Sequence, residues 1–80
     1  MNRNRRNEIR DTMQTLMRCV STLENIRIDE ADYYDNIPEN LRESEHAEES
    51  EYALDSLDDA VNDISLGVDC LEEIVGSEVI

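Results

Sequence analysis

The feature that most constrains this chain is an apolar stripe in its second half. Hydrophobic side chains recur there at alternating intervals of three and four residues over three heptads. An α-helix turns once in about 3.6 residues, so this spacing puts all of them on one side. The pattern predicts a helix over about residues 44–75, with a stripe formed by Leu54, Leu57, Val61, Ile64, Val68, Leu71 and Val75.

A second stripe predicts another helix, over about residues 4–35. Its members have the same spacing and are Ile9, Met13, Leu16, Val20 and Leu23. The period then breaks, because Arg27 and Glu30 occupy the next stripe positions. We expect the stripe to continue instead through Ile26, Tyr33 and Ile37.

The stretch between the helices holds the only proline, Pro38. Proline disfavours helical geometry at the preceding residue, so the first helix should end near Asp35 or Asn36. Residues 36–43 then form a connector, in which we expect Asn36 to cap a short turn over residues 38–41.

The residues beside the connector also have predictable roles. We expect Ser44 to cap the second helix, with Glu45 in its first turn and Gly76 at its C-terminal end. Tyr33 should pack under the bend and Tyr34 should face solvent.

Residues 1–80 are therefore predicted to form one all-α domain, a helical hairpin of two long antiparallel helices with a proline-containing connector. One stripe per helix cannot enclose a core, and the chain has no Phe or Trp to enlarge it. Two hairpins can enclose one as an antiparallel four-helix bundle, so we expect a homodimer. Small residues beside the second stripe, at Ala53, Ala60 and Gly67, would allow close helix packing.

The charge is large and unevenly placed. The net charge is −14 and there is no lysine; residues 1–28 carry six arginines and three acids, whereas residues 29–80 carry one arginine and eighteen acids. Acids one helical turn apart, such as Asp55, Asp59 and Asp63, repel one another by about 0.2–0.5 kcal/mol per pair. Adaptation to high salt would acidify the whole surface, but the first third is basic. Helix stability therefore does not explain why these positions are acidic, and another cause, such as binding, is indicated.

We interpret the outer face of the second helix as a candidate partner-binding surface. Its carboxylates stand about 5–6 Å apart, near the spacing of phosphates along a nucleic-acid strand, so they suit a basic groove that serves for DNA or RNA. A solvated face is the alternative, and a lone exposed leucine needs no special explanation. The candidate residues, with Leu66 as an apolar anchor, are Glu48, Glu51, Asp55, Asp58, Asp59, Asp63, Leu66, Asp69, Glu72 and Glu73.

The residue types do not point to catalysis or to a cofactor. The one histidine, His46, has Glu49 and Ser50 within helical reach, but a two-helix hairpin has no pocket for a catalytic triad. Cys19 and Cys70 are too far apart in such a hairpin for a disulfide or a shared metal. We expect both to be reduced and the protein to be cytoplasmic. No apolar run has the length of a membrane span.

The connector also carries a resemblance. The run DYYDNIPENL, followed by Arg42, Glu43 and Ser44 and an acidic three-four repeat, resembles a group of small acidic helical proteins of unassigned function from bacterial genomes, phages and mobile elements. The resemblance covers roughly residues 30–75 and implies a helical hairpin without enzymatic activity. It also suggests a setting in which small acidic proteins block nucleic-acid-binding or defence proteins of a host.

Two functions are consistent with these observations. In the first, a non-enzymatic acidic protein occupies the basic surface of a host nucleic-acid-binding or defence protein and inhibits it by nucleic-acid mimicry. The alternative is a homodimeric structural or assembly protein whose acids only provide solubility. Neither function requires a cofactor, direct nucleic-acid binding or a membrane.

Overall fold

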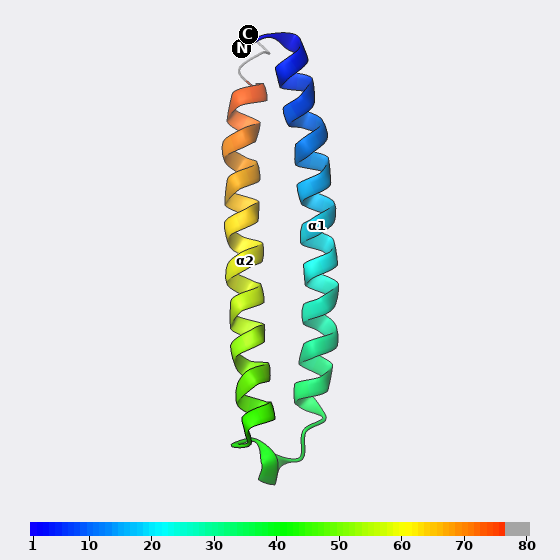
Figure 1. Cartoon of the computed structure of the whole chain (residues 1–80), viewed down its shortest axis with the longest axis vertical. Helices are drawn as coiled ribbons and strands as arrows, with labels where there is room; N and C mark the ends of the chain where they lie inside the picture. Colours follow the sequence, from blue (N-terminus) through cyan, green and yellow to red (C-terminus); the bar gives the residue numbers. More distant parts are fainter. Residues whose placement is uncertain (77–80) are drawn as a thin grey trace.

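A computed structural model describes residues 1–76, which contain helices and no strand. α1 spans Arg3–Asp35 and α2 spans Glu45–Gly76, and the connector between them contains a short 3-10 helix, η1, at Glu39–Leu41. The two α-helices run antiparallel, side by side, with the start of α1 and the end of α2 at the same end of the molecule (Figure 1). The molecule is 59 Å long and only 16 Å by 15 Å across. This confirms the predicted helical hairpin; residues 77–80 of the predicted domain lie outside the described residues.

The hydrogen bonds at the connector confirm one predicted cap and correct another. Ser44 Oγ accepts the Ala47 N–H at 3.3 Å, as expected of an N-cap. The prediction for Asn36 is wrong, because its side-chain amide donates to the Asp32 carbonyl at 2.8 Å. That carbonyl belongs to the last turn of α1 and also accepts the backbone N–H of Asn36 at 3.1 Å. Gly76 is the last described residue of α2, so a cap beyond it lies outside the described residues.

The α2 stripe lies against α1 as predicted. Val68 and Val75 are buried, and the other members of the stripe are half-buried. The stripe also continues toward the connector through Ser50 and Ala47, which are 2% and 0% exposed. We call the contact between the α1 and α2 stripes the seam. These two small residues fill the seam where the helices approach the bend.

The α1 stripe differs from the prediction in its second half. It keeps the three-four spacing through Arg27, Glu30 and Tyr34, all of which are half-buried. The predicted shift through Ile26 and Tyr33 is wrong, since these side chains are 48% and 51% exposed. Polar residues are accepted in the seam because α2 provides polar partners for them, as described below.

The hairpin alone does not complete a core. The buried apolar residues of the described chain are Val20, Ala47, Val68 and Val75, and no large side chain is fully buried. Gly67 does not lie in close contact within the hairpin, because a Cβ added to it would meet nothing within 4 Å. The expectation that small residues pack tightly there is therefore wrong for Gly67 in the single hairpin.

Candidate protein-binding surface

All ten candidate residues of α2 are exposed. Together they form the acidic face, defined by the nine acids and Leu66 named above. Leu66 is 55% exposed in the middle of this face. Most of the acidic face turns away from the line of Ala53, Ala60 and Gly67, but Asp63 lies beside that line, one helical turn from Ala60 and Gly67. One acid, Asp58, also contacts α1, and Glu51 does the same nearer the bend.

Asp58 forms a bidentate ion pair with Arg27. Arg27 Nε donates to Asp58 Oδ1 at 2.5 Å, and the terminal nitrogen Nη2 donates to Oδ2 at 3.2 Å. The hydrogen bond and the charge of Asp58 together raise the pKa of Arg27 above its ordinary value. The fork of the guanidinium matches the carboxylate, so this contact links the two helices in one register.

Tyr34 joins both helices to the connector. Its hydroxyl donates to Glu51 Oε1 at 2.5 Å, and this hydrogen bond is the main reason that the pKa of Tyr34 is raised. The guanidinium of Arg42 lies 4.7 Å from the centre of the tyrosine ring, and Arg42 Nε donates to the Ile37 carbonyl at 3.0 Å. The roles predicted for the two tyrosines are therefore reversed, since Tyr33 is the exposed one.

A third polar contact lies in the seam between the other two. Ser50 Oγ donates to Glu30 Oε2 at 2.5 Å, and Ser50 is 2% exposed. Burying a hydroxyl is costly unless it is hydrogen-bonded, and Glu30 provides the bond. The sequence pattern of α1 marked Arg27 and Glu30 as out of place, but it could not identify their partners on α2.

The other acids of the acidic face are exposed and closely spaced along the helix. From Glu48 to Glu73 the rise of the helix gives a length of about 37 Å. The nine acids over that length amount to one carboxylate per about 4 Å. Each strand of duplex DNA presents one phosphate per about 3.4 Å of helix axis. The linear charge density of the acidic face is thus near that of one nucleic-acid strand.

The charge is also polarised along the molecule. Residues 19–63, the half with the bend, carry two arginines and fifteen acids, a net charge of −13. Residues 1–18 and 64–76, the half with the termini, carry five arginines and five acids, so their net charge is zero. The arginines at the start of α1 lie next to the C-terminal end of α2, where the helix dipole is negative (Figure 1). The negative field is therefore concentrated around the bend.

The described histidine, cysteine and acidic residues do not gather into a metal site. Within residues 1–76 no cluster of three or more His, Cys, Asp or Glu could hold a metal ion. Cys19 and Cys70 are free and exposed, and His46 is exposed. These positions agree with the expected thiols and with a surface histidine.

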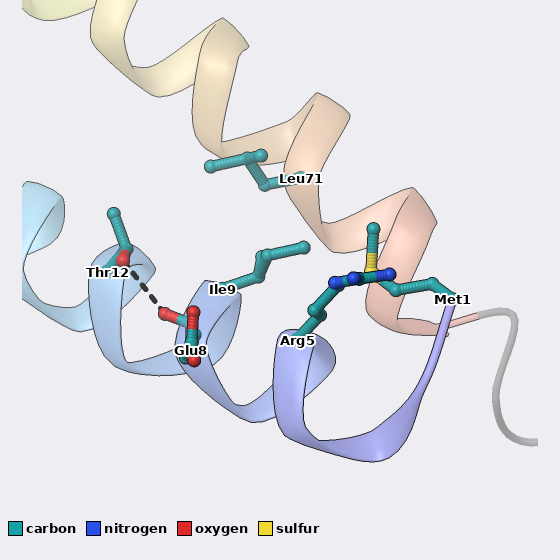
Figure 2. A pocket seen from close by; sticks show the side chains of 6 residues that line it. All are labelled: Met1, Arg5, Glu8, Ile9, Thr12 and Leu71. Carbon is teal, nitrogen blue, oxygen red and sulfur yellow. Dashed lines mark hydrogen bonds between the residues drawn. The ribbon is translucent and has the colours of Figure 1, made fainter.

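A shallow hollow of about 330 Å³ lies at the end of the hairpin that holds the termini (Figure 2). Met1, Ile9 and Leu71 line it with apolar atoms. The hydroxyl of Thr12 donates to the backbone carbonyl of Glu8 at 2.8 Å, so it is bonded to the helix and not to a base. The hollow marks where the seam between the two helices is open.

Neither α1 nor α2, over residues 1–76, is both long and apolar enough to cross a membrane. Comparisons with protein-family models, curated proteins and solved structures find no match to this chain.

Proposed function

We propose that this chain is a non-enzymatic acidic protein that occupies a basic, nucleic-acid-binding surface of another protein and inhibits it. The observation that supports this most is the acidic face, whose exposed carboxylates are spaced along α2 almost as densely as phosphates along one strand. A partner that binds nucleic acid through Lys and Arg would meet a similar charge pattern here. A host nucleic-acid-binding or defence protein in the cytoplasm, in a phage or mobile-element setting, fits the resemblance of the connector.

The helical backbone beneath the acids adds to this proposal. The acids stand on one long helix, which packs on α1 through the seam and the Arg27–Asp58 pair. Charges on a formed helix lose less backbone conformational entropy on binding than charges on a flexible acidic tail. Leu66, 55% exposed among the acids, offers an apolar contact at the centre of the surface.

The experiment is a capture assay with host lysate at low and high salt, followed by identification of the bound proteins. A complex held by charge should dissociate as salt rises, and nucleic acid should compete for the same partner. Replacing Asp55, Asp59 and Asp63 with Asn should slow association and flatten the salt dependence of binding. The same variant should fold at least as well, because like charges one turn apart are removed.

A matched control replaces the acids of the basic segment. Glu8→Gln, Asp11→Asn and Glu24→Gln change the net charge by the same amount, and all three residues are exposed on α1. This variant should keep its affinity for the captured partner. If both triple variants bind alike, only net charge matters; if the α2 triple variant keeps full affinity, the mimicry proposal fails.

A second candidate is a homodimeric structural or assembly protein whose acidic face provides solubility. The half-buried seam favours this reading, because most stripe residues of α2 remain partly exposed in the single hairpin. Both candidates share a proposed dimer of hairpins, an antiparallel four-helix bundle. Assembly through an apolar interface should tolerate high salt, which separates it from capture of a basic partner.

A further inference from the structure

On one side of the hairpin the second half of α1 and the length of α2 each carry an uncharged row, and we call these two rows the apolar flank. On α1 it consists of Cys19, Ile26 and Tyr33, which are seven residues apart and exposed. On α2 it consists of Ala53, Ala60, Gly67 and Ile74, with the same interval. None of these positions is charged.

The two rows lie on the same side of the hairpin because the opposite side is occupied by other residues. Glu24, Ile28 and Asp58 line one hollow together with Arg27, so these positions of α1 and α2 share the polar side. The apolar flank therefore faces away from the Arg27–Asp58 pair. It also leaves most of the acidic face free; Asp63 is the exception, because it is three residues from Ala60 and four from Gly67 and so borders the apolar flank.

Size and charge indicate what covers the apolar flank. A face of 59 Å by 15 Å has a projected area of roughly 900 Å², near the ~800 Å² per partner of a standard interface. A second hairpin has the matching length. Placed with its bend at the same end, it would bring two halves of net charge −13 together. Placed with its bend at the opposite end, it brings each −13 half beside a neutral half that holds five arginines.

The contacts within the hairpin determine which residues would then meet. Tyr34 bonds to Glu51, Glu30 to Ser50 and Arg27 to Asp58, so the middle residue of α1, Cys19, is level with about residue 63 of α2. A two-fold axis at this level, perpendicular to the helices, places each α1 antiparallel to the α1 of the second copy.

The α2 row of the apolar flank is symmetric about that level, whereas the α1 row starts at it, so Ile26 falls opposite the second copy's Thr12. Cys19 falls on the axis, opposite its own counterpart in the second copy. Tyr33 falls opposite the second copy's Arg5, where a cation–π contact can form. On α2, Ala60 falls opposite the second copy's Gly67, whose missing side chain leaves room for a close approach.

We infer that two copies of this chain pair through the apolar flank, with their bends at opposite ends and the two Cys19 thiols at the two-fold axis. This inference rests on the dimer proposed above and specifies its interface; it does not depend on the acidic face. The dimer leaves the acids of the acidic face other than Asp63 outward, so it is compatible with capture of a basic partner.

The test uses the two cysteines as position markers. Cys70→Ser leaves Cys19 alone, and mild oxidation with copper–phenanthroline should convert most of this variant into a disulfide-linked dimer. Cys19→Ser leaves Cys70 alone, and its two copies would stand about 20 Å apart along the direction of the helices. This variant should form the disulfide-linked dimer at least about tenfold more slowly than Cys70→Ser. Equal rates, or a faster reaction at Cys70, would overturn the proposed arrangement.

A second pair of variants tests the interface itself. Gly67→Arg should convert the dimer to a monomer in light scattering while far-UV circular dichroism stays helical, because the added side chain has open space in the single hairpin. Asn62→Arg adds the same side chain to an exposed position on another side of α2 and should leave the dimer intact. A monomeric parent at all concentrations, or a dimer that survives Gly67→Arg, would refute the inference. Because neither assay uses a partner protein, these outcomes are separate from failure of the capture experiment.

Discussion

Val20 lies in the middle of the α1 stripe and is 3% exposed, so its truncation measures what the seam contributes to stability. Val20→Ala removes two methyl groups, which is about 1.6 kcal/mol of transfer free energy at roughly 0.8 kcal/mol each. The cavity left behind raises the expected loss to about 2 kcal/mol. A chain of this length has a free energy of unfolding of roughly 4–12 kcal/mol, so the loss is a large share of it.

Thermal and urea unfolding followed by far-UV circular dichroism, at one protein concentration, measure this loss. The midpoint temperature should fall by roughly 8–16 °C. The control is Ile28→Ala, because Ile28 is 57% exposed on the same helix, and its truncation should change stability by less than about 0.5 kcal/mol. Equal losses in the two variants would show that the seam between α1 and α2 is not the core.

Three further predictions concern single contacts. Glu51→Gln should lower the pKa of Tyr34 toward its ordinary value near 10, as measured by ultraviolet titration of the phenol. Because folding raises the pKa of Tyr34, the contact stabilises the hairpin at neutral pH, and this stabilisation is lost as pH rises through the folded-state pKa. An unchanged titration of the phenol would argue against the Tyr34–Glu51 bond. Gly67→Ala should stabilise the dilute, monomeric hairpin by about 1 kcal/mol, since its Cβ meets open space, and a destabilised monomer would contradict that geometry. Ser44→Ala removes the acceptor for the Ala47 N–H and should cost about 0.5–2 kcal/mol in urea unfolding; no loss would show that the cap is unimportant.

The hairpin and the α2 stripe could be predicted because their signals are local. Three-four spacing identifies a helix, and Pro38 identifies where the first one ends. The predicted α2 stripe lacked only Ala47 and Ser50, which are both buried. Their side chains are small or polar, so a hydrophobic pattern does not reveal them.

The second half of α1 could not be predicted in the same way. Arg27 and Glu30 look out of place when α1 is considered alone, and only the structure pairs them with Asp58 and Ser50. The error at these two positions then displaced the expected stripe by one residue and exchanged the roles of Tyr33 and Tyr34. For the acidic face, exposure could be predicted from charge, but the contacts of Asp58 and Glu51 with α1 could not.

The polar contacts of the seam also bear on how the hairpin forms. They join residues separated by 17, 20 and 31 positions, whereas Ile9 and Leu71, which line one hollow at the other end of the hairpin, are 62 positions apart. The entropy lost in closing a loop grows with its length, so the contacts beside the bend are the least costly to form first. Helix pairing should then start beside the connector and extend along the seam, so that the region of Ile9 and Leu71 pairs last. Directional hydrogen bonds would align the two helices before most of the apolar surface is buried, so a chain that pairs one heptad out of register meets mismatched polar groups at its first step.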